Sequence, residues 1–412
     1  MKTVLLIFPE IYNSKSEIRY PPFGLLDIAS YLRRLNISVH IFDRNLEGNS
    51  LDELKIKLEE REYDFIGISS LFIQKDDANH ILDMLKNEKK SKIVLGGDYF
   101  VTYKDIYSNL ADFVVCGDGE LFFEQLVNGT IKDGGIYYPE GLDSLDDIPI
   151  PDKELLEQVA WDKRIFSLKT SRGCPFKCLF CSSINNNKIV RYHSSQYILD
   201  YISFIYNTYG ISKFRFMDDV FTLNKGRVLS FCEKLVKSKM PVEISECFSH
   251  ISVCDMEIFE HMKWAKFNSV QVGIESANNK VLQTIGKNIT REAIVKTVNL
   301  IVACGLKVEG LYMLGNIGDT AETIKETIEF AKNLPTYKDW FSFACPLPNS
   351  KFYELAQQEG TFIEKDFNLY TNANIVYIPK NMTFTELEEL MISARKMVKE
   401  KIIMNIKNKM FN

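Results

Sequence analysis

The chain has 412 residues, of which 46% are hydrophobic and 25% charged, a balance typical of a globular protein with a large core. Its formal net charge of -5 gives no general attraction for nucleic acid, and no apolar run approaches the ~20 residues of a membrane span. The N-terminal apolar run ends at Pro9, too short for a signal peptide, and the nine cysteines lack disulfide-like spacing, so we expect a cytoplasmic protein.

Short β-branched runs alternate with amphipathic segments over residues 1–130. The predicted strands, which are continuous apolar runs, are residues 3–8, 38–42, 65–68, 92–95 and 113–115. The predicted helices between them are residues 25–35, 51–61, 78–86 and 103–110. Such alternation predicts an α/β domain with a doubly wound, Rossmann-like parallel sheet that helices cover on both faces.

Glycines, prolines and small or polar residues lie near the carboxyl ends of these strands, where such sheets bind ligands. Glycine lets a ligand approach the backbone closely, but the same residues also suit tight strand–helix turns, and both interpretations stay open. The candidate binding residues are Pro21, Pro22, Ser69, Ser70, Leu71, Gly96, Gly97, Asp98, Gly117, Asp118 and Glu120.

The next segment, residues 131–163, combines Gly-Gly with three prolines among acidic residues and is predicted to be an extended linker. Six strand candidates separated by helical runs follow within residues 164–345. They are residues 166–170, 213–217, 242–247, 269–274, 307–313 and 339–344. Six such units predict a partial (β/α)6 barrel, related to the TIM barrel, with its chemistry at the carboxyl ends of the strands. Residues 346–412 are expected to form a largely helical C-terminal segment.

Three cysteines, Cys174, Cys178 and Cys181, follow the first of these strands at C-x3-C-x2-C spacing. Three thiolates on a short loop suit a 4Fe-4S cube whose fourth iron stays open to a small molecule. A zinc site is the first alternative, although it normally needs a fourth Cys or His close by. Three unrelated buried cysteines are the second alternative.

This cysteine run resembles the signature of radical S-adenosylmethionine (radical SAM) enzymes, in which an aromatic residue, here Phe180, precedes the last cysteine. The resemblance implies that the open iron chelates S-adenosylmethionine (SAM) and that one electron from the cluster produces a 5'-deoxyadenosyl radical. An electron donor such as flavodoxin or ferredoxin is then expected. No catalytic acid or base is assigned.

The same resemblance implies which residues contact SAM. Met217, Asp218 and Asp219 occupy the place where the family holds the amino group, although an acidic pair can also cap a helix. Glu275 and Ser276 match the family's Gly-Ile-Glu-Ser strand end near the ribose or methionyl group, although they also suit a satisfied buried polar pair. The segment from Tyr312 to Gly315 resembles the family's loop near adenine.

The N-terminal domain resembles the cobalamin-binding domain that precedes many radical SAM enzymes. The matching pieces are Pro21-Pro-Phe-Gly24, Ile66-Gly-Ile-Ser69, Leu95-Gly-Gly97 and Val115-Cys-Gly-Asp-Gly-Glu120. The resemblance implies that the strand-end residues named above bind cobalamin. The Asp-x-His-x-x-Gly motif is absent from the sequence, so no protein histidine is expected on cobalt.

Our leading hypothesis is a cobalamin-dependent radical SAM methyltransferase that methylates an unactivated carbon of a small-molecule or peptide substrate. One alternative uses both cofactors for rearrangement, cyclisation or oxidation without methyl transfer. Another is an epimerase or coupling enzyme with a vestigial B12 domain. A non-enzymatic cofactor carrier or sensor is the alternative outside catalysis, and the cysteine loop on a barrel argues against it.

Overall fold

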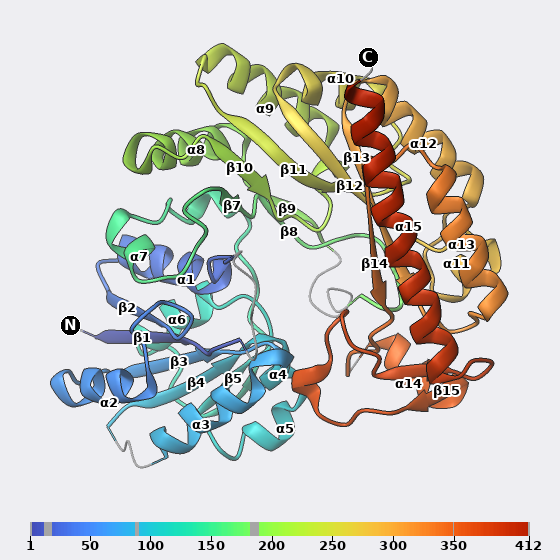
Figure 1. Cartoon of the computed structure of the whole chain (residues 1–412). Helices are drawn as coiled ribbons and strands as arrows, with labels where there is room; N and C mark the ends of the chain where they lie inside the picture. The colour runs from blue at the N-terminus through green and yellow to red at the C-terminus, as the bar shows by residue number, and fades with distance from the viewer. Residues whose placement is uncertain (1, 12–18, 87–89, 182–188, 349, 411–412) are drawn as a thin grey trace. The chain divides into compact units, whose positions relative to one another are not determined.

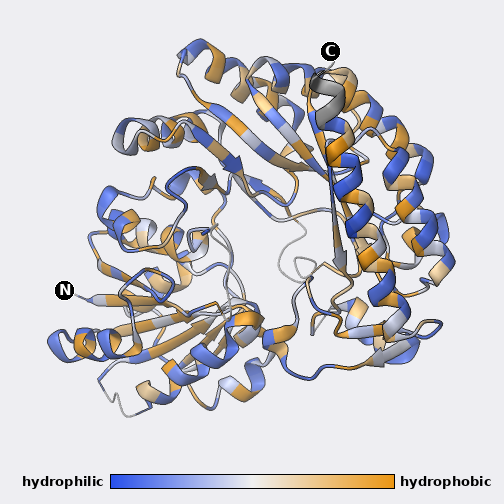
Figure 2. Ribbon diagram, viewed as in Figure 1, coloured by the Kyte–Doolittle hydropathy of each residue, from blue (hydrophilic) through white to orange (hydrophobic). Residues whose placement is uncertain are grey.

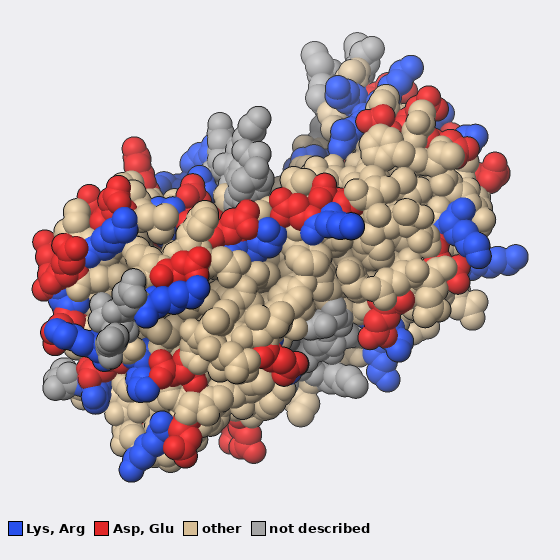
Figure 3. Space-filling model, turned by 90° about the horizontal axis from the view of Figure 1, so that it is seen from below, with Lys and Arg blue, Asp and Glu red and all other residues tan. Residues whose placement is uncertain are grey.

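The computed structural model describes residues 2–11, 19–86, 90–181, 189–348 and 350–410, with side chains described as far as residue 405 (Figure 1). The chain divides into two compact units, Met1–Ser167 and Leu168–Asn412. Among the described residues, no helix combines the length and the apolar character that crossing a membrane requires. On the face drawn in Figure 3, acidic and basic side chains are interspersed, and neither sign dominates.

The first unit is built on a parallel six-stranded sheet with the order β2-β1-β3-β4-β5-β6. Its strands are β1 (Thr3–Phe8), β2 (Ser38–Asp43), β3 (Phe65–Ser69), β4 (Lys92–Gly96), β5 (Phe113–Val115) and β6 (Gly135–Tyr137). Its helices are α1 (Phe23–Arg34), α2 (Leu51–Glu60), α3 (Lys75–Leu85), α4 (Gly97–Thr102), α5 (Lys104–Tyr107), α6 (Glu120–Val127) and α7 (Lys153–Glu157). The predicted doubly wound α/β fold is confirmed.

Apolar runs explain this sheet. Four consecutive residues of β1, Val4 to Ile7, are each 0% exposed, which requires cover on both faces of the strand. Hydrophobic colour accordingly follows the strands, whereas the surrounding helices carry both colours (Figure 2). Helix α2 begins at a capped end, because the Ser50 side chain accepts a hydrogen bond from the Glu53 backbone N–H at 3.1 Å.

The segment that we expected to be an extended linker is partly structured. Strand β6 extends the first sheet, and α7 is joined to α1 by ion pairs of Arg33 with Asp152 at 2.8 Å and with Glu154 at 2.9 Å. The buried Asp43 carboxylate also accepts a hydrogen bond from the Ala160 backbone N–H at 2.8 Å. These contacts place the segment within the first compact unit, which ends at Ser167.

The second unit contains a parallel six-stranded sheet with the order β14-β13-β12-β11-β10-β7, so that neighbouring strands follow chain order. Its strands are β7 (Phe166–Leu168), β10 (Lys213–Phe216), β11 (Glu243–Ser249), β12 (Phe267–Glu275), β13 (Lys307–Leu314) and β14 (Lys338–Phe343). The helices between them are α8 (Ser195–Tyr209), α9 (Lys225–Ser238), α10 (Met256–Trp264), α11 (Asn279–Thr284), α12 (Arg291–Ala303) and α13 (Ala321–Asn333). Within the described residues β7 and β14 remain unpaired edges, as in the partial barrel that the sequence predicts.

The C-terminal segment completes this unit. Helix α14 (Lys351–Glu359) is followed by the antiparallel pair β15 (Gly360–Phe362) and β16 (Tyr377–Pro379). The long helix α15 (Phe384–Met410) then packs against α13 and the edge strand β14 (Figure 1).

Candidate functional site: a three-cysteine loop and its strand-end partners

The three cysteines lie on the loop after the first strand of the barrel. The loop leaves β8 (Ser171–Arg172), which pairs with β9 (Arg191–Tyr192), and it turns at Gly173 with φ +92°. Two backbone hydrogen bonds hold its far end, from Leu179 N–H to the Ile285 carbonyl at 2.9 Å and from Phe352 N–H to the Leu179 carbonyl at 3.1 Å. The loop is therefore fixed to segments that lie more than a hundred residues further along the chain.

The three thiols of the loop differ in how far they are buried. Cys178 is buried, Cys174 and Cys181 are half-buried, and their charges influence one another. Among the described residues, no three His, Cys, Asp or Glu side chains converge closely enough to hold one metal ion. A 4Fe-4S cube that keeps one iron open needs three thiolates, one on each of its other irons, and this loop supplies that number. Burial raises the pKa of Cys178 to about 11, so its ionisation depends on a bound positive centre.

A buried lysine lies beside the cysteines. Lys287 Nζ is 2.8 Å from Glu275 Oε1, and the ammonium lies 5.7 Å from the centre of the Phe180 ring. Burial disfavours the charged form, but the neighbouring Glu275 carboxylate outweighs burial and raises the pKa of Lys287. The site thus holds a positively charged group next to the thiols that would bind a cluster.

Backbone geometry creates the space for this ion pair. Glu275 has φ +64°, an uncommon conformation for a residue with a side chain, and a Cβ at Gly273 would lie 2.5 Å from both Glu275 Oε1 and Lys287 Nζ. Any larger residue at position 273 would therefore have to displace the two side-chain ends of the pair. Sequence reasoning identified Glu275 but missed Lys287, because nothing in the sequence pairs residues twelve positions apart across a loop.

The two adjacent aspartates at the end of β10 have different surroundings. Asp218 is 1% exposed and accepts hydrogen bonds from the Thr170 and Ser171 backbone N–H groups, the latter at 3.0 Å. It also pairs with the buried Arg227 at 3.4 Å. Asp218 therefore organises the approach to the cysteine loop rather than offering a free carboxylate. Asp219 is exposed, its charge reaches Cys174, and it stays our prediction for the ammonium contact together with the half-buried Met217.

The structure does not bring Tyr312 to this site. Tyr312 is 1% exposed, stacks on Phe341 at 4.7 Å between ring centres, and has its hydroxyl beside Asp339 on the face that α15 covers. The physical reason is strand alternation, because Met313 rather than Tyr312 lies on the opposite face. Gly315, with φ +83°, lies against Leu387 of α15.

Ser276 is a satisfied buried residue. Its hydroxyl lies 3.3 Å from Thr327 Oγ1 and accepts a hydrogen bond from the Asn278 backbone N–H at 3.1 Å. These contacts favour the structural interpretation of Ser276 over a contact to SAM. Phe180, by contrast, is half-buried and lies beside the Lys287 ammonium, as a residue at the site would.

A row of polar side chains occupies the sheet face that carries the Glu275–Lys287 pair. Gln271 Nε2 donates to Glu246 at 3.0 Å, and Glu246 pairs with Arg215. Glu309 accepts hydrogen bonds from Ser269 at 3.0 Å and from Trp340 Nε1 at 2.8 Å. Trp340 nevertheless remains 46% exposed. Sequence reasoning missed this row, which gives the interior of the partial barrel a polar lining.

In the first unit, most of the candidate binding residues gather at the carboxyl edge of the sheet. Ser69 ends β3, Gly96 ends β4, and the Ser70 backbone N–H donates to the Gly96 carbonyl at 3.1 Å. A Cβ at Gly97, with φ +82°, would lie 2.6 Å from the Ser70 carbonyl oxygen, so close backbone packing already requires this glycine. Leu71 is 40% exposed beside them.

The other candidates surround the same strand ends. Pro21 and Pro22 directly precede α1, and Asp98 lies in the first turn of α4. Gly117 and Asp118 follow β5, and the buried Glu120 begins α6. The candidates thus lie at the carboxyl edge of the first sheet, where the backbone is tightly packed. Their contacts to cobalamin stay predictions.

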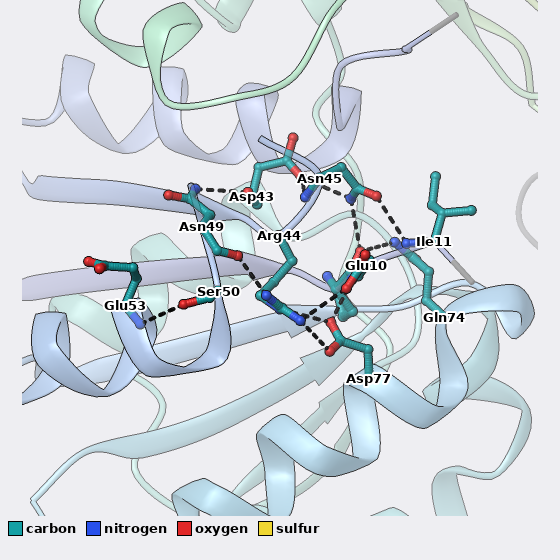
Figure 4. Close-up of polar contacts among 11 residues, drawn as sticks. Glu10, Ile11, Asp43, Arg44, Asn45, Asn49, Ser50, Glu53, Gln74 and Asp77 are labelled. Atoms are coloured by element: carbon teal, nitrogen blue, oxygen red, sulfur yellow. Dashed lines mark hydrogen bonds and ion pairs between the residues drawn. The ribbon is translucent and has the colours of Figure 1, made fainter. Parts of the chain in front are cut away.

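A neighbouring polar network, which we did not predict, locks the ends of β1 and β2 (Figure 4). Arg44 pairs with Asp77 at 3.0 Å and with Glu10 at 3.1 Å. Asn45 donates to the Pro9 carbonyl at 3.0 Å and accepts from the Ile11 backbone N–H, also at 3.0 Å. Since these charges are compensated within the unit, they need no ligand.

Two family models match the chain, one to each unit. The B12 binding domain model matches residues 9–127, and the radical SAM superfamily model matches residues 168–331. Among curated relatives, an uncharacterized methyltransferase of Pyrococcus horikoshii is 28% identical over 95% of this chain and 91% of its own length. The anaerobic magnesium-protoporphyrin IX monomethyl ester cyclase of Rubrivivax gelatinosus is 26% identical over 95% of this chain and 76% of its own.

Solved structures share the fold. The cobalamin-dependent S-adenosylmethionine radical enzyme OxsB, with aqua-cobalamin and SAM bound, matches 95% of this chain and 66% of its own with a TM-score of 0.81 at 16% identity. The radical SAM methyltransferase TsrM of Kitasatospora setae matches 94% of this chain and 82% of its own with a TM-score of 0.72 at 16% identity. With a matching family model on each unit, the chain belongs to the radical SAM enzymes that carry an N-terminal B12-binding domain.

Proposed function

We propose that this protein is a cobalamin-dependent radical SAM methyltransferase acting on an unactivated carbon of a small-molecule or peptide substrate. The single observation that carries the proposal is the three-cysteine loop beside the buried Lys287–Glu275 pair, in a chain that also has a B12-binding domain. When bound, the cluster with SAM supplies a hydrogen-abstracting radical, and cobalamin supplies a methyl group.

The residues of the chain hold and orient these groups. The three cysteines bind the cluster, and Asp218 fixes the backbone that leads into their loop. Lys287 offsets the negative charge of the thiolates and, with Glu275, faces the polar end of SAM, while Asp219 accepts from its ammonium. The polar row from Arg215 to Trp340 lines the space for the substrate. Presenting the substrate carbon correctly to the reacting groups is the positional effect on which the reaction depends.

A first experiment needs no substrate. The full chain is reconstituted anaerobically with iron, sulfide and hydroxocobalamin, reduced, and given SAM with a deuterated methyl group. We expect one S-adenosylhomocysteine and one labelled methylcobalamin per bound corrinoid, measured by mass spectrometry. Corrinoid that binds but takes up no label would contradict methyl transfer, and a chain that binds no corrinoid would support a radical-only enzyme.

A second experiment counts products with candidate substrates. A methyltransferase makes S-adenosylhomocysteine and 5'-deoxyadenosine in near-equal amounts. The cyclase relative from Rubrivivax gelatinosus makes a reaction without methyl transfer the second candidate function. Deoxyadenosine that rises with substrate while S-adenosylhomocysteine does not would favour that second function.

A further inference from the structure

His250 is a buried histidine that the proposed function does not yet use. It directly follows β11 and is 6% exposed. Its imidazole stacks on the ring of Phe176, with 3.5 Å between ring centres and 16° between planes. Phe176 lies on the cysteine loop between Cys174 and Cys178, so His250 packs directly on the loop that holds the cluster.

The hydrogen bonds of His250 fix its tautomer. The Ser252 backbone N–H donates to Nδ1 at 3.2 Å, so Nδ1 is the unprotonated nitrogen. The proton of a neutral imidazole then lies on Nε2, which is a hydrogen-bond donor. Within the described part of the chain, Nε2 is buried and has no hydrogen-bond partner. Buried donors almost always have an acceptor, so this one is expected to find its acceptor in a bound group.

The surroundings indicate what kind of acceptor it is. Lys287, whose charge acts on His250, is the same ammonium that faces Glu275 and the Cys178 thiol. Burial and this neighbouring cation both disfavour a second proton on the imidazole, so the ring stays a neutral donor. The neutral Nε2–H of His250, beside the Lys287 ammonium, suits an electron-rich acceptor. At this loop such an acceptor would be either a cluster sulfur or the carboxylate of SAM.

We propose that His250 donates its Nε2–H to an anionic acceptor of the occupied cluster site. The hydrogen bond would then tune the reduction potential of the cluster, if the acceptor is a cluster sulfur, or orient SAM, if the acceptor is its carboxylate. This inference rests on the cluster of the proposed function. It concerns a residue that no sequence motif pointed to, and its test does not depend on turnover.

The test compares the wild-type chain with H250F, which keeps an aromatic ring against Phe176 but removes the donor. The matched control is H193F, because His193 is also a buried histidine, 4% exposed, stacked at 4.0 Å on Tyr197. All chains are reconstituted anaerobically. The reduction midpoint and the electron paramagnetic resonance signal of the cluster are recorded with and without SAM, and SAM affinity is measured by equilibrium dialysis.

Hydrogen bonds to cluster sulfurs are among the factors that set the potential. A more negative midpoint in H250F without SAM would identify a cluster sulfur as the acceptor. An unchanged midpoint with about tenfold weaker SAM binding would identify the SAM carboxylate. If H250F matches H193F and the wild type in both measurements, the inference is wrong.

A second variant separates the donor from folding. H250Q retains an N–H, and we expect it to restore the wild-type midpoint and SAM affinity. A glutamine variant that behaves like H250F would overturn the inference. Failure of the wild-type chain itself to bind iron and sulfide would instead refute the proposed function, which the iron content of the unmodified protein reveals first.

Discussion

The ammonium of Lys287 and the carboxylate of Glu275 form an ion pair at 2.8 Å, and their side chains are only 6% and 11% exposed. The two side-chain ends meet over Gly273, where a Cβ would lie 2.5 Å from each of them. A buried pair of this kind is costly to break, because the remaining charge has no water around it.

We expect K287M to destabilise the second unit by about 3 kcal/mol or more, since it leaves the Glu275 carboxylate buried and unpaired. The double variant K287M/E275Q removes both charges and should recover most of that loss. Urea denaturation of the chain without its cofactors, under anaerobic conditions, measures the free energy of unfolding of both variants. Additive losses in the double variant would show that the two groups do not interact.

Replacing Asp218 and replacing Asp219, the two aspartates after β10, should change the stability of the chain by different amounts. We expect D218N to lower stability by about 3 kcal/mol and to reduce iron retention, because Arg227 would remain buried without its carboxylate. The matched variant D219N changes an exposed neighbour, so its urea midpoint should stay within the small range of surface substitutions.

The D219N variant also tests the prediction that Asp219 contacts the ammonium of SAM. D219N should bind SAM about tenfold more weakly in equilibrium dialysis, since it loses a charge-assisted hydrogen bond. Wild-type SAM affinity in D219N would remove Asp219 from the site and leave the ammonium to backbone carbonyls.

Local patterns explain how much the sequence could predict. The central strands of the first unit were predictable because they are largely apolar runs, and the cysteine loop was predictable because its chemistry is contained in eight residues. Strand β6 was missed because it is three residues long, half-exposed and set among glycines and prolines. Lys287 and His250 were missed because their roles depend on tertiary contacts, to Glu275 and Phe176, that no spacing along the chain encodes.

Each cluster cysteine should be indispensable. We expect C174A, C178A and C181A to lose most bound iron and sulfide and to form no 5'-deoxyadenosine, because three thiolates are the minimum for a stable site-differentiated cube. The control C304A removes a half-buried cysteine that directly follows α12 and should retain full iron. Zinc in place of iron in the wild-type chain, measured by metal analysis, would revive the zinc alternative.

Stability should fall as pH rises through the titration of Asp319. Burial raises the pKa of this carboxyl to about 6, from an ordinary value of 3.8. The folded state therefore binds the proton more tightly than the unfolded state, and the stabilisation is full below pH 3.8 and lost by about pH 6. Relative to D319N, the wild type should lose about 2 kcal/mol between pH 4 and 7.

Asp255 provides a control of opposite sign. The hydrogen bond and charge of Lys225 lower the pKa of its carboxyl, so its stabilisation exists above the unfolded pKa and is lost as the solution becomes more acidic. The stability difference between wild type and D255N should therefore not decrease from pH 4 to 7. A parallel pH dependence for both variants would contradict the assignment to Asp319.

Helix α15 should depend on one buried lysine. Lys401 Nζ lies 2.7 Å from Asp339 Oδ2 on the edge strand β14 and also donates to Thr336 and to the Ala331 carbonyl. We expect K401M to cost about 3 kcal/mol or more and to speed hydrogen exchange in α15 and β14, because Asp339 would stay buried without its partner.

Two comparisons isolate the contribution of the Lys401–Asp339 ion pair. K396M changes an exposed lysine of the same helix and should alter neither stability nor exchange. K401M/D339N removes both charges and should restore much of the stability, because the penalty arises from the unpaired carboxylate rather than from the lost helix contact. Since β14 is an edge of the sheet, faster exchange confined to α15 and β14 would show that this ion pair holds the helix against that edge. Equal exchange in K401M and K396M would show that apolar packing alone is sufficient.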